Sequence, residues 1–288
     1  MNPVVRSFHH ADTGTWTHVL VDVATLRAAV IDPVLDFDSA SGCLRADSAR
    51  RVLEYLGTAS LTVEWILETH AHADHLTAAA WMRDTLTPTP RIGIGARIGE
   101  VQQHFASVLG IDMATIENHA FDARFADGEH FRVGTLDVQV IATPGHTPDG
   151  ITYVAGDAAF IGDTLFAPRS GSARCDFPGA SAATLHASIQ RLYALPDATR
   201  LFLAHDYPPD GEAPMAETTV AAQKAGNIHV RADTSAHEYI ALREARDATL
   251  PVPKLLWPAL QVNIRGGLLP APEPNGMRVL RIPLRDET

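Results

Sequence analysis

The sequence predicts a mixed α/β domain in which a β-hairpin comes first and strands then alternate with helices. The chain has 288 residues, of which 46% are hydrophobic and 20% charged; this composition is typical of globular proteins and excludes a fibrous or disordered one. Two runs rich in β-branched residues, Thr17–Ala24 and Arg27–Ile31, are separated by a short turn and predict the hairpin. After them, short apolar runs alternate with segments of helical periodicity.

The first half of the chain continues with helices and buried strands in turn. Helices are predicted where apolar residues recur at helical spacing, and strands where short runs are apolar or β-branched. One helix must end before Pro88, because proline lacks a backbone donor and restricts the residue before it. The expected elements are a helix at Asp47–Leu56, a strand at Val63–Glu68, a helix at Leu76–Leu86, a strand at Arg91–Ile94 and a helix at Ile98–Leu109.

The second half repeats this order of elements. One strand is expected to end at the turn Pro144-Gly145, and two apolar runs joined by Gly156-Asp157 predict a second hairpin. The expected elements are strands at Leu136–Ala142, Ile151–Ala155, Ala158–Ile161 and Arg200–Ala204, a helix that carries Leu185, Ile189 and Leu192, and helices at Ala213–Ala225 and Ser235–Ala248.

The C-terminal stretch is dense in proline and glycine, as flexible tails are. It also contains apolar residues such as Trp257, Leu260 and Ile264, which are out of place in a solvated tail. We therefore expect residues 251–288 to pack on the body of the protein or on a partner subunit. Because no shift in composition marks a boundary, residues 1–288 are expected to form a single domain.

Charge and cysteine content narrow the functional classes. The chain has 23 lysines and arginines against 34 aspartates and glutamates, and its net charge is −11. Nucleic acids and anionic membranes bind basic surfaces, so neither partner is expected. Two cysteines, Cys43 and Cys175, indicate no disulfide framework. No signal-peptide pattern and no apolar run long enough to span a membrane is visible, so a soluble cytoplasmic protein is expected.

The segment Thr69-His70-Ala71-His72-Ala73-Asp74-His75 carries the strongest functional signal. It follows a predicted strand and precedes a predicted helix. In an extended segment alternate residues project to the same side, so His70 and His72 can share one ion, while Asp74 and His75 start the helix and face the same crevice. Neutral imidazoles and a carboxylate suit zinc or iron. A solvated polar loop is the alternative interpretation, which the density of the cluster disfavours.

Three later residues fit the same interpretation. His146 lies in a tight turn after one predicted strand, Asp163 at the end of a hairpin strand, and His205 at the end of another strand. The ends of adjacent strands converge on one edge of a sheet, where α/β proteins build their sites. Alone, His146 or His205 would be interpreted as a hydrogen-bonded structural histidine. Together with the histidine-rich segment they predict a metal centre.

In this order the motifs resemble those of the metallo-β-lactamase superfamily: HxHxDH, a Gly-His turn, a bridging Asp and a late His. The resemblance covers most of the chain. It implies an αββα sandwich, with two β-sheets packed face to face and helices outside.

Within the superfamily the chain is most similar to the persulfide (sulfur) dioxygenases, including the bacterial branch called β-lactamase-hydrolase-like. The similar stretches are Ile31–Val34, Leu67–His75, Thr143–Pro148, Gly156–Leu165, Ala173–Gly179, His205–Pro208, Glu217–Val220 and Asn227–Val230. The resemblance implies one Fe(II) per chain, held by His70, His146 and Asp163. The other ligands of the superfamily would then support these three instead of binding the metal; they are His72, Asp74, His75 and His205.

The resemblance also implies a reaction that serves sulfide detoxification. Glutathione persulfide, O₂ and water would give glutathione and sulfite. Two histidines and one carboxylate leave positions on Fe(II) open for substrate and O₂. A homodimer is expected.

Two residues near the site motifs are candidates for substrate contacts. Arg174 and Tyr207 would meet the carboxylates of glutathione, for which the guanidinium fork of arginine is suited. An ion pair between Arg174 and Asp176 is the structural alternative. The chain departs from the bacterial pattern at Arg169-Ser170, where that pattern has Asp-Tyr, and at Ala180, where it has Gly.

Other functions fit the same motifs. A binuclear zinc thioester hydrolase like glyoxalase II would use the full ligand set, with zinc in place of Fe(II). A non-catalytic, sulfide-responsive binding protein would hold the metal without turning over O₂. A β-lactamase is disfavoured, because only the shared metal motif speaks for it. Cys175 has no evident base partner and is interpreted as a packed residue.

Overall fold

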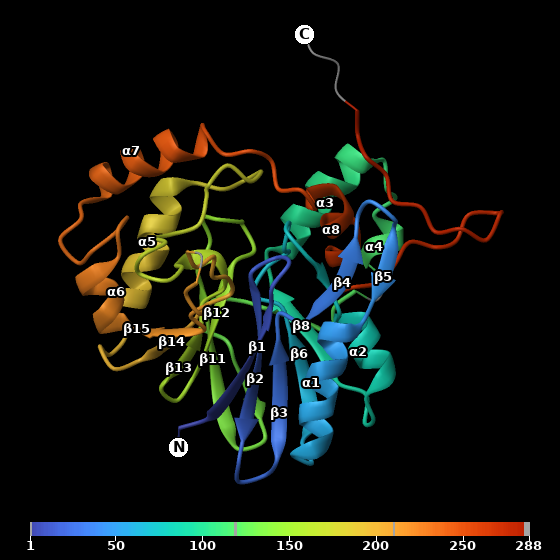
Figure 1. The fold of residues 1–288 in the computed structure, drawn as a ribbon, viewed down its shortest axis with the longest axis horizontal. Coiled ribbons are helices and arrows are strands. Elements are labelled where there is room, and N and C mark those ends of the chain that lie inside the picture. The colour runs from blue at the N-terminus through green and yellow to red at the C-terminus, as the bar shows by residue number, and fades with distance from the viewer. Residues whose placement is uncertain (1, 118–119, 210, 285–288) are drawn as a thin grey trace.

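Two six-stranded β-sheets packed face to face form the centre of the protein (Figure 1). The computed structural model describes residues 2–117, 120–209 and 211–284. In spatial order, the first sheet consists of β1 (Val4–His10), β2 (Thr15–Asp22), β3 (Arg27–Ile31), β6 (Thr62–Leu67), β8 (Arg91–Gly95) and β9 (Ala123–Phe125). The second consists of β10 (His130–Val133), β11 (Leu136–Ala142), β12 (Ile151–Ala155), β13 (Ala158–Phe160), β14 (Arg200–Phe202) and β15 (Glu217–Thr219). A small third sheet joins β5 (Cys43–Arg45), β4 (Val34–Asp38) and β7 (Leu76–Thr77).

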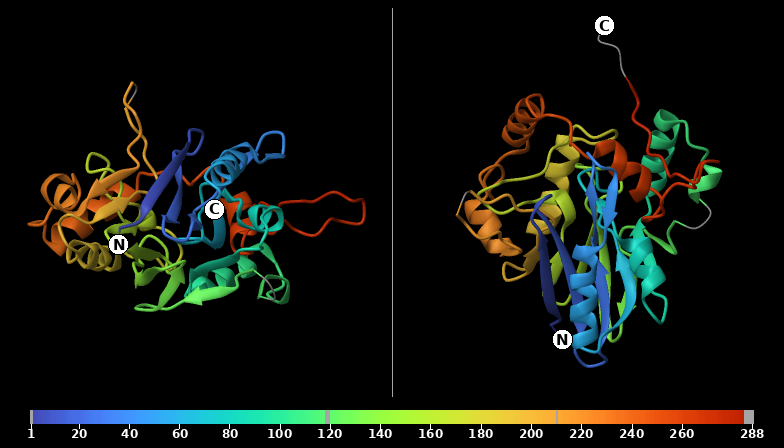
Figure 2. Two further views of the ribbon diagram at one scale, coloured as in Figure 1. Left: turned by 90° about the horizontal axis from the view of Figure 1, so that it is seen from below. Right: turned by 45° about the vertical axis from the view of Figure 1, so that its right-hand side comes forward.

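Helices cover the outer face of each large sheet (Figure 2). The helices on the side of the first sheet are α1 (Asp47–Thr58), α2 (Ala79–Thr85), α3 (Ile98–Leu109), α4 (Ala114–Glu117) and α8 (Leu256–Asn263). Those on the side of the second sheet are α5 (Ala182–Tyr193), α6 (Val220–Gly226) and α7 (Ala236–Asp247). The mixed α/β class and the αββα sandwich expected from the sequence are confirmed.

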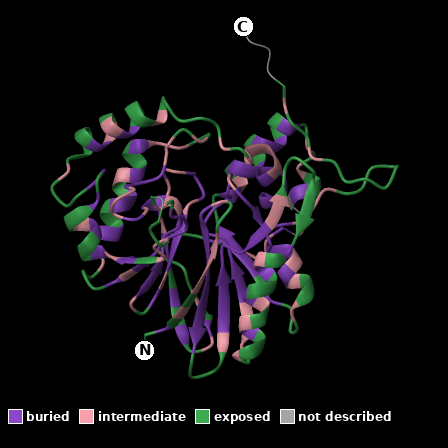
Figure 3. Ribbon diagram, in the orientation of Figure 1, coloured by how far each residue is buried: buried purple, intermediate pink, exposed green. Residues whose placement is uncertain are grey.

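Alternating side chains give the first sheet two apolar faces. Along β2, Leu20 points to the second sheet and packs with Tyr153 and Phe160, whereas Val19 and Val21 pack with the helices outside. Both faces of the sheet are buried, so a central strand such as β3 carries apolar side chains on both sides. Figure 3 shows this distribution: buried residues fill the central strands, and exposed residues follow the outer sides of the helices.

Two expected helices begin later than the sequence pattern indicates. The helix expected at Leu76–Leu86 begins at Ala79, because Leu76–Thr77 pairs with β4 and the Thr77 hydroxyl accepts a hydrogen bond from the Ala79 amide. Asp74 and His75 therefore do not start a helix; they lie in the loop before β7. Similarly, the helix expected at Ala213–Ala225 begins at Val220, after the short strand β15. The Thr219 side chain caps it by accepting from the Ala222 amide.

The C-terminal segment contributes one helix to the core. Ala259, Leu260 and Val262 of α8 are fully buried. At the end of α8, the Asn263 side chain donates to the carbonyls of His72 and His75 at 2.8 and 2.7 Å, and its oxygen accepts from the Thr77 amide at 2.9 Å. This part of the expected packing segment therefore lies on the body of the protein. The single-domain organisation and the homodimer stay predictions.

None of the described helices is both long and apolar enough to cross a membrane.

Replacing Asn263 by Ala should destabilise the protein by about 3 kcal/mol. Two carbonyls and one amide would lose their partner in a buried site, and each such loss costs roughly 1–3 kcal/mol. Urea unfolding of Asn263→Ala measures the effect. Asn275→Ala is the matched control, because Asn275 accepts from the Met277 amide in an exposed turn. Equal stabilities of the two variants would contradict the role of Asn263.

Candidate metal centre

Buried carboxylates hold the histidine loop, residues 69–75, in place between β6 and β7. Asp32 accepts from the amide and the hydroxyl of Thr69, both at 2.8 Å. Asp149 accepts from the Ala71 amide at 2.8 Å. Both carboxylates are 1% exposed, so these hydrogen bonds compete with little water. With the Asn263 contacts, they fix the loop from both sides.

The remaining members of the centre follow strand ends of the second sheet. His146 lies in the turn after β11, Asp163 in a single helical turn (Gly162–Thr164) after β13, and His205 a few residues beyond the end of β14. Glycine is required beside the first two. Gly145 has φ +133° and Gly162 φ +51°, and a Cβ at Gly145 would stand 2.3 Å from the Leu185 amide nitrogen. The expectation that the strand ends bring these residues together is met.

His70, His146 and Asp163 converge on one point. One candidate ligand atom from each lies within 4.8 Å of the others. The Nε2 atoms of His70 and His146 are 3.9 and 3.5 Å from the same carboxylate oxygen, Oδ2 of Asp163. Two imidazoles and a carboxylate could therefore hold one metal ion here.

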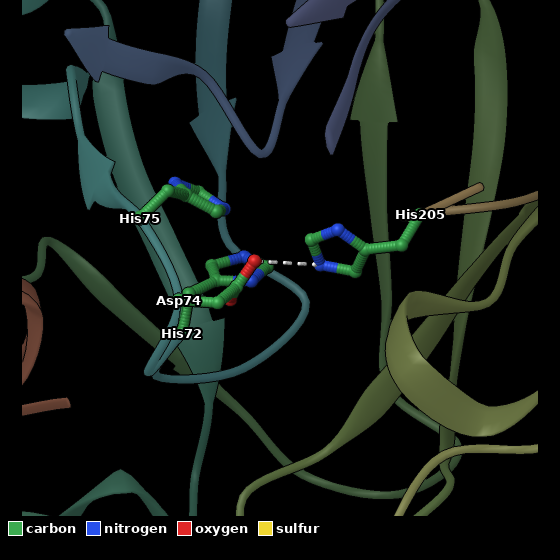
Figure 4. Close-up of side chains that lie close together, drawn as sticks. All are labelled: His72, Asp74, His75 and His205. Carbon is green, nitrogen blue, oxygen red and sulfur yellow. Dashed lines mark ion pairs between the residues drawn. The ribbon is translucent and has the colours of Figure 1, made fainter. Parts of the chain in front are cut away.

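Figure 4 shows a second group of candidate ligands. It consists of His72, Asp74, His75 and His205. In the figure the histidine loop presents its three side chains toward His205, which approaches from the second sheet. His205 Nε2 is 3.3 Å from Asp74 Oδ2 and 3.4 Å from Asp163 Oδ1. The two oxygens of Asp163 thus face different groups, as those of a bridging ligand do.

His70 and His72 belong to different groups of ligand atoms. The expectation that they share one ion, which assumed an extended segment, is therefore wrong. Behind His72 lie two buried carboxylates, Asp32 and Glu68, which with His72 form a third group of close ligand atoms. His72 Nε2 is 3.0 Å from Asp32 and 3.5 Å from Glu68. These contacts turn one edge of the His72 ring away from the first group.

Hydrogen bonds fix which nitrogen of each ring is free. His146 Nδ1 donates to the carbonyl of Arg174 at 2.7 Å, and His75 Nδ1 donates to that of Leu76 at 3.2 Å. A carbonyl only accepts, so the proton of each neutral ring is on Nδ1 and Nε2 keeps its lone pair. His70 Nδ1 lies 3.1 Å from the Thr69 hydroxyl, whose proton goes to Asp32. Its Nε2 is therefore the free nitrogen as well.

Burial keeps the rings of His70 and His75 neutral. Desolvation, with His72 as the next contribution, lowers the pKa of His70 well below its usual value and that of His75 to about 3. His72 differs: burial alone would lower its pKa, but Asp32 and Glu68 raise it well above the usual value. Burial raises the pKa of Glu68 to about 7. A neutral imidazole is the form that binds a metal.

The buried ligand atoms fit a metal. Within the described ranges, several have no hydrogen-bond partner: Nε2 of His70, His75 and His205, Nδ1 of His72, Oδ2 of Asp74 and Oδ1 of Asp163. A buried polar atom without a partner costs free energy, and a cluster of such atoms facing one another calls for a bound ion. The donors are imidazoles and carboxylates, which suit zinc and iron. The cluster thus indicates a metal cofactor.

A cavity of about 1040 Å³ opens above the centre, with His75, His146 and Asp163 among its lining residues. Tyr207 also lines it; the Tyr207 ring stacks on His205, and its hydroxyl is 3.4 Å from His205 Nδ1. Arg174 lines it too, but its guanidinium holds Asp176 through two nitrogens at 2.5 Å and the Pro251 carbonyl at 2.7 Å. The ion pair considered as the structural alternative for Arg174 is therefore present.

The positions that depart from the bacterial pattern lie at the same cavity. Arg169 and Ser170 line it, and Arg169 donates to Asp206 at 2.6 Å. Cys175 is packed among apolar residues, and burial raises the pKa of its thiol to about 12, so it is no nucleophile.

Sequence reasoning missed the residues that hold the loop. Asp32, Glu68, Asp149 and Asn263 are all buried and polar. For Asp32 a signal exists, since it stands between the end of β3 and Pro33. Asn263 has none, because it lies 191 positions from His72.

Comparison with known proteins agrees with this geometry. The profile of the metallo-beta-lactamase superfamily matches residues 12–205. The solved structure of ETHE1 from Myxococcus xanthus superposes with a TM-score of 0.73 at 31% identity, covering 92% of this chain and 100% of that one.

Three curated relatives illustrate the range of similar proteins. The beta-lactamase hydrolase-like protein of Xylella fastidiosa is 47% identical over 98% of this chain, which spans only 65% of that relative. Glyoxylase B2 of Dictyostelium discoideum is 38% identical, with 97% and 96% of the two chains covered. The mitochondrial persulfide dioxygenase ETHE1 of mouse is 25% identical, with 93% and 91% covered. With its site at the strand ends and the superfamily profile matched over most of its length, the chain belongs to the metallo-beta-lactamase superfamily.

Proposed function

We propose that this protein is a non-haem Fe(II) persulfide dioxygenase that oxidises glutathione persulfide with O₂ to sulfite and glutathione. The observation that carries the proposal is the convergence of His70, His146 and Asp163, with the free nitrogens of both histidines directed at one oxygen of Asp163. Two histidines and one carboxylate are the ligand set of many iron oxygenases. Similarity to proteins named ETHE1 supports the same reaction.

In this proposal each residue of the ligand set has a defined task. Fe(II) bound by His70, His146 and Asp163 would supply open coordination positions and the electrons that make O₂ reactive. The Arg174 carbonyl holds the His146 ring so that Nε2 faces the metal position. Thr69 does the same for His70. Because burial already keeps His70 neutral, no proton has to leave it when the metal binds.

The second group supports the first in this proposal. His205 Nε2 faces Asp163 Oδ1, so it can hold that carboxylate with its other oxygen toward the metal. Tyr207, on the cavity wall beside His205, is proposed as a substrate contact. For Arg174 we propose a positioning role, because Asp176 already occupies its fork.

A binuclear thioester hydrolase is the second candidate. It is favoured by the close spacing of His72, Asp74, His75 and His205 and by the position of Asp163 between the two groups. Similarity to the relative named glyoxylase B2 supports this candidate as well. Oxygen uptake and the number of iron ions bound per chain distinguish the two candidates.

Iron-loaded protein given glutathione persulfide should consume O₂ and release an equal amount of sulfite. The reason is that both oxygen atoms of O₂ and one from water end in sulfite. An oxygen electrode and sulfite determination measure the two quantities. Hydrolysis of lactoylglutathione without air, combined with no O₂ uptake, would show that the dioxygenase proposal is wrong.

His146→Ala should lose bound iron and activity while its circular dichroism stays unchanged. The substitution removes one of three protein ligands, and the turn that carries it is held by Gly145 and its own backbone contacts. Iron is measured by metal analysis of protein purified without air. His237→Ala is the matched control, because His237 is an exposed histidine on α7. Full iron content in His146→Ala would exclude His146 as a ligand.

Iron titration of the wild type should saturate near one ion per chain. His75→Ala should keep most of this iron, since losing a residue that only supports the ligands weakens affinity or activity by roughly 10–100-fold. His70→Ala should lose it. Saturation at two ions, reduced to one in His75→Ala, would instead identify a binuclear centre and support the hydrolase.

A further inference from the structure

The cavity above the metal centre has an uneven distribution of charge. Six cationic side chains line it: Arg45, Arg169, Arg174, Arg243, Arg246 and Lys254. Four of them form ion pairs with carboxylates, namely Arg45 with Asp47 at 3.4 Å, Arg169 with Asp206 at 2.6 Å, Arg174 with Asp176 at 2.5 Å and Arg243 with Asp247 at 2.7 Å.

The other two cations are free to bind a ligand. Among the residues that the structure describes, neither Arg246 nor Lys254 makes an ion pair or a side-chain hydrogen bond. Arg246 is near the end of α7, and Lys254 is in the segment that follows it. His229 beside Arg246 adds no charge to this wall, since burial, together with Arg243 and Arg246, lowers its pKa to about 4. The two cations without a partner thus line the same cavity as the metal centre.

We propose that Arg246 and Lys254 form a subsite that binds the carboxylates of the glutathione part of the substrate. This inference rests on the proposed function. Glutathione carries two carboxylates and one ammonium group, so its anionic ends match two cations that have no partner in the protein. Elsewhere on the wall, Asp12 of the turn between β1 and β2 and Asp38 of β4 present carboxylates, which the ammonium group would complement.

A smaller cavity of about 410 Å³ offers a competing location for the substrate. It shares His146 with the large cavity and is lined mainly by apolar side chains, among them Phe105, Phe177 and Trp257, and by the Arg174–Asp176 ion pair. A persulfide with an alkyl group would fit this cavity, whereas the charged ends of glutathione would lose their hydration there. The charge of the preferred substrate therefore distinguishes the two locations.

Steady-state kinetics of iron-loaded Arg246→Gln and Lys254→Gln test the subsite. Each variant should raise KM for glutathione persulfide about tenfold, because a hydrogen bond to a charged group contributes roughly 1.5–3 kcal/mol, while kcat stays nearly constant. With the persulfide of mercaptoethanol, which has no carboxylate, KM should not change. Arg231→Gln is the matched control, since Arg231 is an exposed arginine outside the cavity. An unchanged KM for glutathione persulfide in both variants would overturn the subsite. The same conclusion follows if hexyl persulfide has the lower KM.

Calorimetric titration of the iron-loaded proteins with glutathione under nitrogen separates this inference from the reaction. Weaker binding in both variants, with normal binding in Arg231→Gln, supports the subsite even if the wild type consumes no O₂. Equal binding in all proteins would overturn the subsite even if the wild type is an active dioxygenase. The two proposals can thus fail independently.

Discussion

The metal centre depends on how one loop is held. Residues 69–75 carry four of the seven candidate ligands, yet the loop has no regular secondary structure of its own. Its backbone is bound by Asp32, Asp149 and Asn263, which come from three distant parts of the chain. All three are nearly inaccessible to water, so the loop cannot exchange these hydrogen bonds for solvent at low cost. The positions of His70 and His75 are therefore set before any metal binds, which lowers the entropy lost on binding.

The same anchors also give the histidines different electrostatic surroundings. Asp32 accepts from Thr69 with both oxygens, and its Oδ1 also lies 3.0 Å from His72 Nε2, so a single carboxylate both fixes the loop and favours a charged His72. At His70 and His75 the effect of burial is larger than that of nearby carboxylates, so both rings stay neutral. One short motif thus contains histidines whose pKa values are shifted in opposite directions. Position relative to Asp32 and Glu68, more than spacing, decides which ring offers a free nitrogen to the first group.

The sequence predicted which candidate residues would converge, but not the residues that hold them in place. The ligand candidates could be predicted because each follows a run of apolar or β-branched residues, and strand ends converge in this class of fold. The start of α2 could not be predicted, because Leu76–Thr77 is apolar enough for a helix and becomes a strand only through pairing with β4. Asn263 was equally hidden, since its partners are backbone groups that leave no pattern in the sequence. Likewise, the spacing of Arg174 and Asp176 allowed both an ion pair and a free arginine, and only the fold shows that the fork is filled.

The negative net charge of the chain makes the cations on the cavity wall important for attracting an anionic substrate. A chain with a net charge of −11 repels anions at long range, so an anionic substrate must be attracted locally. Arg169 and Arg174 line the cavity and form ion pairs with Asp206 and Asp176. Their charges are therefore neutralised within the protein. At position 169, the aspartate of the bacterial pattern would face Asp206 as a like charge, whereas arginine neutralises it. With the inner cations engaged in this way, the attraction left for a substrate comes from Arg246 and Lys254. These two charges stand at the end of α7 and just beyond it, where the chain turns from the second sheet toward α8 and the first.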